Sequence, residues 1–194
     1  MSFSHESTGY VEIMKFKNPD TFFLGDIYWQ LFGGLTFRQY ALSERIRLCM
    51  WFAFYRQIAA YNKMHKNDVL WVLRLERGDQ SGRLHFHFLI SGLPQQNIKI
   101  SDRFAMRALW KRLGGGISKI DLYDSRLHGL PYMAGVLGCP ASDIGSTGAM
   151  AYESAKFGSA SSVLMLSKSV LKVIQANHRR DASTLAMSRT DRNM

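Results

Sequence analysis

Two neighbouring stretches in the middle of the chain carry the hydrophobic patterns of β-strands. The stretch from Val69 to Glu76 is rich in β-branched and aromatic residues, and the stretch from Arg83 to Ile90 alternates between polar and apolar side chains. Both features are typical of strands, whose successive side chains point to opposite faces. The residues between the two stretches include two glycines and other turn-forming residues. The pattern therefore predicts a β-hairpin.

The register of this hairpin predicts a cluster of polar side chains. If the strands pair symmetrically about the turn, Glu76 lies opposite His85 and Arg74 lies opposite His87. Opposed residues share a face about 5 Å apart, and side chains two positions apart on a strand are roughly 7 Å apart. Glu76, His85 and His87 are therefore predicted to converge, an arrangement that suits Mg²⁺ or Mn²⁺. The alternative is a half-exposed hairpin whose histidines are only solvated or hydrogen-bonded.

Helical and extended patterns alternate along the rest of the chain. In chain order they predict a strand at 29–37, a helix at 43–62, the hairpin, a helix at 101–113 with Ser101 as its N-cap, and a strand at 117–123. This order predicts an α+β fold, with a ferredoxin-like (RRM-like) antiparallel sheet and helices packed mainly on one face. The predicted apolar sides are Ile46, Cys49, Met50, Ala53 and Ile58 in the first helix, and Phe104, Ala105, Ala108 and Leu109 in the second.

The charge of the chain favours a polyanionic partner. The formal net charge is +10, and nucleic acid is the commonest partner of strongly basic proteins. Arg103, Arg107 and Lys111 recur every four residues along the second predicted helix. This row is either a solvated helix face or a stripe that binds DNA phosphates.

Length and composition predict a single domain at 1–176, with 1–27 as an N-terminal arm or loose extension and 177–194 as a basic, flexible tail. The two cysteines offer no disulfide framework, which favours a reducing, cytoplasmic setting. No signal peptide is apparent, and the longest apolar run, at 48–55, is too short to span a bilayer. We therefore expect no membrane association, and the oligomeric state is left open.

Tyr132 is the first candidate for a nucleophile. Pro131 suits the first position of a helix and Gly138 its end, so Tyr132 would lie in the first turn, where anions are favoured. A phenol with a pKa near 10 needs a metal ion or a nearby cation to react at neutral pH. The alternative is a tyrosine that simply packs against the sheet. A second candidate is Tyr152, which has Lys156 one helical turn later.

Three short motifs together resemble those of HUH endonucleases, especially the rolling-circle replication initiators of small plasmids and single-stranded DNA viruses. Residues 32–37, Phe-Gly-Gly-Leu-Thr-Phe, resemble the first motif of that family, and His85 and His87 with the upstream Glu76 resemble the second. Tyr132 resembles the third motif, but Gly135 stands where those proteins commonly carry a lysine. The resemblance extends over residues 30–140.

This resemblance implies an HUH nuclease architecture and a metal-dependent DNA-nicking and strand-joining activity. Glu76, His85 and His87 would hold Mg²⁺ or Mn²⁺, and Tyr132 would form a 5′-phosphotyrosine link with single-stranded or hairpin origin DNA. Replication by the host machinery would follow, in the cytoplasm of the host cell. A related transposase or mobilisation relaxase, and a non-catalytic nucleic-acid-binding module on the same fold, are the alternatives. No Gly-x-x-x-x-Gly-Lys-Ser/Thr loop is present, which counts against the longer initiators with helicase motifs.

Overall fold

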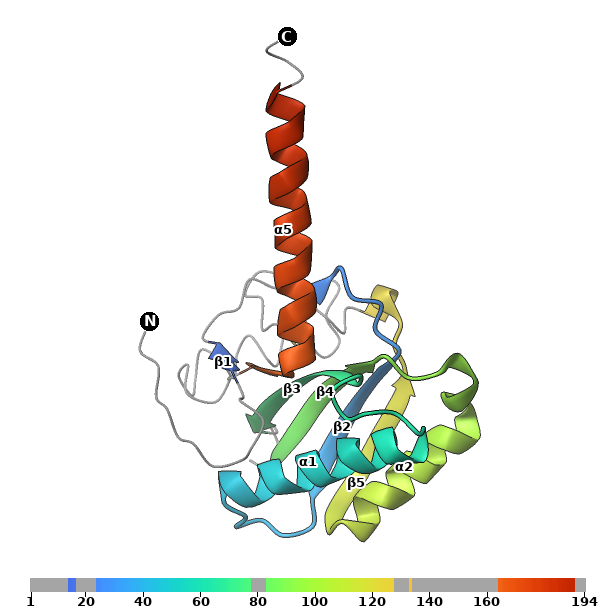
Figure 1. Cartoon of the computed structure of the whole chain (residues 1–194). Coiled ribbons are helices and arrows are strands. Elements are labelled where there is room, and N and C mark those ends of the chain that lie inside the picture. Colours follow the sequence, from blue (N-terminus) through green and yellow to red (C-terminus); the bar gives the residue numbers. More distant parts are fainter. Residues whose placement is uncertain (1–13, 17–23, 78–82, 128–132, 134–163, 191–194) are drawn as a thin grey trace.

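The computed structural model describes residues 14–16, 24–77, 83–127, 133 and 164–190, and its central feature is an antiparallel sheet (Figure 1). Within these residues, six strands lie in the order β1-β6-β3-β4-β2-β5. The strands are β1 (Met14–Phe16), β2 (Leu31–Phe37), β3 (Leu70–Arg77), β4 (Leu84–Ser91), β5 (Gly115–Leu122) and β6 (Leu164–Leu166). The helices are α1 (Glu44–Tyr61), α2 (Ile100–Arg112) and α5 (Lys168–Thr190), with short 3₁₀ turns η2 (Gln95–Asn97) and η3 (Ser125–Leu127).

The structure confirms the α+β class and the predicted succession of elements. From β2 to β5 the chain forms strand, helix, strand, strand, helix and strand. The hairpin of β3 and β4 also has the predicted register, with Glu76 paired with His85 and Arg74 paired with His87. All pairings between neighbouring strands are antiparallel in the described part of the chain.

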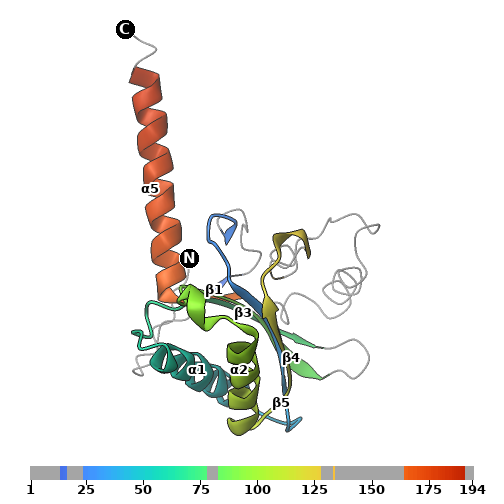
Figure 2. The same ribbon diagram turned by 90° about the vertical axis from the view of Figure 1, so that its right-hand side faces the viewer.

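Different hydrophobic clusters cover the two faces of the sheet. Figure 2 shows α1 and α2 together on one side of the sheet, where Trp51 packs on Phe88 of β4 and Trp110 packs on Phe37 of β2. On the other face, Val72 of β3 packs with residues of α5 and with Met133. Side chains alternate along β3 and β4, so the predicted metal ligands share this second face. The sheet therefore separates its main core from the candidate site.

Helix α1 has the predicted ends but not the predicted buried side. Ser43 caps it by accepting a hydrogen bond from the backbone N–H of Ile46 (3.3 Å). Of the five residues predicted for the apolar side, Ile58 is buried, Met50 and Ala53 are half-buried, and Ile46 and Cys49 are exposed. The helix instead buries Trp51, Phe52, Phe54 and Tyr55. Apolar residues occur around most of this helix, so burial of the large aromatic side chains decides which side faces the sheet.

Helix α2 begins earlier than predicted and buries a different stripe. The backbone N–H of Lys99 donates to the Asp102 carboxylate (2.9 Å), so Ser101 lies inside the helix and is not its N-cap. The buried residues are Met106, Leu109 and Trp110, whereas Phe104, Ala105 and Ala108 are exposed. Trp110 fits because Gly115 has no side chain: a Cβ there would lie 2.1 Å from the indole Nε1.

A helix covers residues 177–190 of the segment for which the sequence predicts a basic, flexible tail. Helix α5 continues from Lys168 to Thr190 and extends away from the sheet in Figure 1. Residues 168–190 contain neither glycine nor proline, which favours a continuous helix. In its first turn, the fully buried Val170 packs in the cluster on the site face of the sheet. In the predicted N-terminal arm, Met14–Phe16 pair with β6. No helix in the described residues is long and apolar enough to cross a membrane.

Candidate metal site

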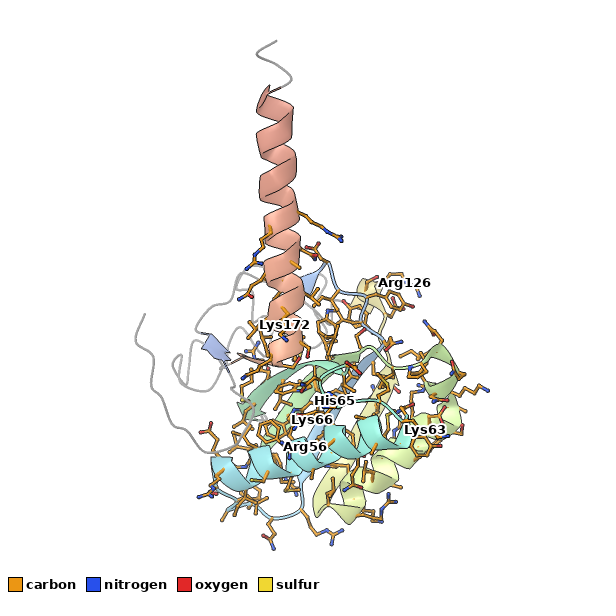
Figure 3. All side chains as sticks on the ribbon, viewed as in Figure 1. Arg56, Lys63, His65, Lys66, Arg126 and Lys172 are labelled. Carbon is orange, nitrogen blue, oxygen red and sulfur yellow. The ribbon has the colours of Figure 1, made fainter. Side chains whose placement is uncertain are left out.

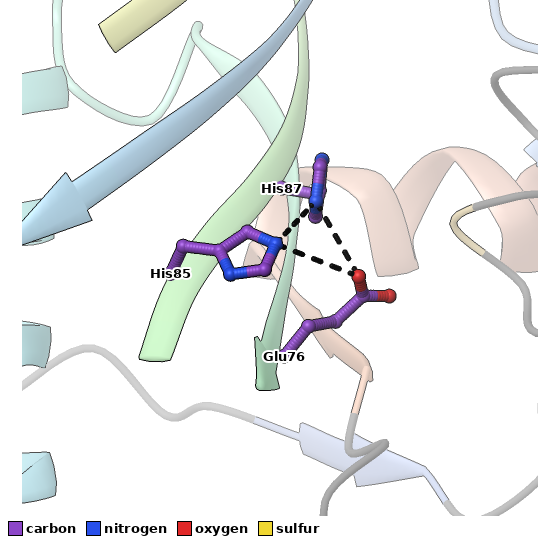
Figure 4. Close-up of side chains that lie close together, drawn as sticks. All are labelled: Glu76, His85 and His87. Carbon is purple, nitrogen blue, oxygen red and sulfur yellow. Dashed lines mark hydrogen bonds and ion pairs between the residues drawn. The ribbon is translucent and has the colours of Figure 1, made fainter. Parts of the chain in front are cut away.

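Strands β3 and β4 bring Glu76, His85 and His87 together on the face opposite α1 and α2 (Figure 4). The Nε2 atoms of the two histidines are 2.8 Å apart. Glu76 Oε2 lies 3.4 Å from Nε2 of His87 and 3.9 Å from Nε2 of His85. The two histidine side chains are 20 and 16% exposed, and the glutamate is 8% exposed. The predicted convergence of these three residues is thus confirmed.

The donor atoms fit a divalent ion. Ion-to-ligand distances of about 2.0–2.2 Å place neighbouring donors about 2.8–3.6 Å apart in octahedral or tetrahedral geometry. The three separations found here lie close to that range, so small side-chain rotations suffice for one ion to contact all three atoms. Two imidazoles and one carboxylate leave further coordination positions for water or a substrate. The site could therefore hold a metal ion with an open side.

His87 is held in the neutral form that binds metals. Burial, the neighbouring His85 and the positive charge of Arg74 lower the pKa of His87 from 6.5 to about 3. Its ring stacks on Phe32 of β2, with 6.0 Å between ring centroids and an interplanar angle of 18°. Because only the neutral imidazole offers a free lone pair, His87 can coordinate an ion at neutral pH without first losing a proton.

Arg74 orients the carboxylate of the site. Its Nε lies 2.8 Å from Oε1 of Glu76, and both side chains are buried. Its Nη1 donates a hydrogen bond to the backbone carbonyl of Met133 (3.1 Å). Sequence reasoning placed Arg74 on the correct face but assigned it no role. The predicted pairing of Arg74 with His87 could have indicated this role, because it places a cation beside the predicted ligands.

Strand β2 forms the neighbouring part of the same face. Gly34 pairs with His87 on one side and with Lys119 of β5 on the other. A Cβ at Gly34 would be in ordinary contact with the His87 ring, at 3.6 Å. Because Gly34 has no side chain, nothing from this position covers the imidazole. The Lys119 side chain is 83% exposed and lies 3.8 Å from Asp121. Lys119 is therefore an exposed cation on the same face of the sheet as His87, with Gly34 between the two residues.

The three basic residues predicted to bind DNA lie on α2. Arg103 and Arg107 contact the Asp121 carboxylate at 3.7 and 3.3 Å, and Arg107 also donates to the carbonyl of Ile120 (2.8 Å). Lys111 is exposed. Two members of the row therefore have a partner on β5, and DNA binding by this row stays a prediction.

The candidate nucleophiles Tyr132 and Tyr152, and the accompanying Lys156, lie outside the described residues. Met133, which directly follows Tyr132, is described and is 1% exposed. Its side chain packs in the cluster that covers the site face of the sheet. The structure therefore describes the proposed ligands and one residue of the tyrosine segment, and the roles of the tyrosines stay predictions.

Comparisons with protein-family models, with curated proteins and with solved structures find no match to this chain. The fold and the site together define an α+β protein with a candidate metal site on an antiparallel sheet.

Proposed function

We propose that this protein is a metal-dependent single-stranded DNA endonuclease and strand transferase of the HUH type, acting as a rolling-circle replication initiator. The observation that carries the proposal is the Glu76, His85 and His87 cluster on two paired strands. These are the positions at which the sequence resembles the second motif of that family. A structural histidine pair has no need of a carboxylate in register with it.

The arrangement of strands also supports the proposal. Strands β3-β4-β2-β5 are consecutive in the sheet, and α1 and α2 connect β2 to β3 and β4 to β5. A ferredoxin-like unit has two such strand-helix-strand connections with their helices on one face. The metal ligands lie on the opposite face, where the side chains of His85 and His87 are 20 and 16% exposed and could meet a substrate. Because many unrelated proteins share this architecture, the ligands carry the functional argument.

The proposed reaction is a phosphoryl transfer to a tyrosine. A bound ion would polarise a non-bridging oxygen of the scissile phosphate and stabilise the charge of the transition state. The Tyr132 phenol would lose its proton to solvent and attack phosphorus. The bond from phosphorus to the 3′ oxygen would break, and that oxygen would take up a proton. A 5′-phosphotyrosine and a free 3′-hydroxyl would result, and the reverse attack would rejoin the strand.

Charge on the protein would hold the DNA backbone. The net charge of +10 suits a polyanion, and Lys119 places an exposed ammonium group on the site face. We assign Arg103, Arg107 and Lys111 a supporting role in phosphate contact around the β5 edge. The origin DNA would be single-stranded or a hairpin, and host replication proteins would extend the released 3′ end.

A non-catalytic nucleic-acid-binding module is the second candidate, because Gly135 replaces the lysine common in the third family motif. Covalent attachment to DNA separates the two functions. The protein is incubated with a pool of single-stranded and hairpin oligonucleotides and Mn²⁺, and the products are analysed by denaturing gel and peptide mass mapping. The nuclease is expected to give a DNA-linked peptide that contains Tyr132.

Two variants and a chelator control this experiment. The adduct should disappear with chelator and in His87→Gln, and it should persist in His65→Gln, which alters an exposed histidine between α1 and β3 (Figure 3). An adduct on Tyr152 would keep the activity and move the nucleophile. DNA binding without cleavage or adduct, across the whole pool, would overturn the nuclease and favour the binding module.

A further inference from the structure

Arg74 is a buried cation that contacts two separate parts of the molecule. It is 3% exposed, although arginine is almost never buried without a partner. Its Nε meets Oε1 of Glu76 at 2.8 Å, and its Nη1 donates to the carbonyl of Met133 at 3.1 Å. The planar guanidinium fixes the directions of its donors. One rigid group therefore connects a candidate metal ligand to the backbone of a distant segment.

The first contact leaves one oxygen of Glu76 for a metal ion. Oε1 faces Arg74, whereas Oε2 faces the Nε2 atoms of His87 and His85 at 3.4 and 3.9 Å. An ion-pair partner in contact with a metal ligand orients it and tunes its affinity for the ion. Arg74 thus makes Glu76 a one-oxygen ligand and fixes the direction of that oxygen.

The second contact concerns the residue that follows Tyr132. The Met133 carbonyl accepts from Arg74, and the Met133 side chain packs on the same face of the sheet. We infer that Arg74 is a positioning residue that couples the metal site to the chain at Met133, the residue that follows the proposed nucleophile in the sequence. This inference rests on the proposed function, because that function supplies the role of Tyr132.

A purely structural role explains these contacts less well. Taking an ion pair out of water is expensive, and apolar side chains of similar volume often stabilise a fold equally well. A stabilising arginine also needs no partner among metal ligands. Arg47 offers the comparison, because it is 7% exposed on α1 and lies 5.5 Å from the centre of the Phe37 ring, on the other face of the sheet.

The test replaces each buried arginine with lysine in the full chain. Arg74→Lys keeps the positive charge but loses the planar donors that hold two acceptors at once, and Arg47→Lys is the matched control. Mn²⁺ affinity is measured by electron paramagnetic resonance of the free ion. Backbone hydrogen exchange is measured in the metal-free protein for a peptide that contains Met133. Both readouts are independent of DNA cleavage.

We expect Arg74→Lys to weaken Mn²⁺ binding by about 10- to 100-fold and to speed exchange in the Met133 peptide, and Arg47→Lys to do neither. Wild-type affinity and exchange in Arg74→Lys would overturn the inference, as would equal losses in both variants. A wild-type protein that binds Mn²⁺ but forms no DNA adduct would overturn the nuclease and leave the coupling by Arg74 intact. A wild-type protein that forms the DNA adduct, combined with an Arg74→Lys variant unchanged in both readouts, would support the nuclease and overturn the coupling by Arg74.

A measurement on the wild-type protein covers the case in which Arg74→Lys does not fold. Arginine labelled with ¹⁵N reports the side-chain Nε–H groups, and a group buried away from water exchanges slowly. Histidine signals report whether Mg²⁺ binds. One slowly exchanging arginine signal should shift together with the histidines. Histidine shifts without any arginine shift would overturn the inference.

Discussion

Acidification of the metal-free protein should cost stability through His87. In the folded protein, burial, His85 and Arg74 lower the pKa of His87 to about 3, whereas the unfolded chain has the ordinary value of 6.5. Below pH 6.5 the unfolded state therefore binds a proton that the folded state does not. The stabilising contribution of the neutral histidine is complete above pH 6.5 and is lost progressively as the pH falls towards 3.

The size of this effect follows from the two pKa values. One pKa unit corresponds to about 1.36 kcal/mol. Between pH 7 and pH 5 the unfolded state takes up most of one proton that the folded state does not, so the free energy of unfolding should fall by about 2 kcal/mol because of this group. Aspartate and glutamate with ordinary pKa values change little in this interval, so the window isolates histidine.

Urea denaturation at pH 7, 6 and 5, with chelator present, measures the effect. The wild-type protein should lose about 2 kcal/mol more than His87→Gln over this interval, and His65→Gln should behave like the wild type. Mg²⁺ in place of the chelator should raise the free energy of unfolding at each pH, because the ion binds the folded site and not the unfolded chain. Equal pH slopes in the wild-type protein and His87→Gln would refute the assignment of a strongly lowered pKa to His87.

A Cβ at Gly115 would lie 2.1 Å from Nε1 of Trp110, so Gly115→Ala should lower the free energy of unfolding by about 1–3 kcal/mol in urea. Gly34→Ala, whose Cβ would be 3.6 Å from its nearest side-chain atom, should cost less, and equal costs would contradict the packing argument. Glu76→Gln should weaken Mn²⁺ binding by more than about 100-fold with an unchanged circular dichroism spectrum; retained affinity would exclude this carboxylate as a ligand. Lys119→Met should lower affinity for single-stranded DNA and reduce the salt dependence of binding by about one phosphate contact, as measured by fluorescence anisotropy. An unchanged salt slope would place the DNA elsewhere.

The metal cluster could be predicted from the sequence because it depends on local register. The two strands are separated by a short turn, and a period of two assigns each residue to a face. The pairing of Glu76 with His85 follows directly, and the structure has the same pairing. Two histidines and a carboxylate on one face then predict a candidate metal site without any knowledge of distant contacts.

The buried sides of the helices could not be predicted in the same way. Apolar residues surround much of α1, and the sequence does not state which of them the sheet will cover. The structure covers Trp51 and Phe54, which are fully buried, and leaves Ile46 49% exposed. In α2, Trp110 is buried because Gly115 makes room for its ring. Such a choice depends on packing between elements, which the period of a single helix does not contain.

The contact between Arg74 and Met133 joins residues 59 positions apart. No local pattern encodes a contact of that kind, because the donor is a side chain in a strand and the acceptor is a backbone carbonyl that every residue possesses. Sequence reasoning could place Arg74 beside the histidines, but only the folded chain identifies its second partner. The same limit applies to Tyr132, whose distance from the metal ligands the sequence pattern does not determine.

The charges of the site indicate what kind of ligand a bound ion would attract. The carboxylate of Glu76 is the one acidic group among the three ligands, and Arg74 balances its charge at 2.8 Å. His87 is neutral at physiological pH, because its pKa is lowered to about 3. A divalent ion would therefore keep most of its charge in a site of low exposure, where electrostatic interactions are stronger than in water. An anionic ligand would lower that charge, and a phosphodiester does so while offering a further oxygen for coordination. The balance of charges around Glu76 thus favours an anionic ligand over a neutral one, which agrees with the phosphodiester of the proposed function.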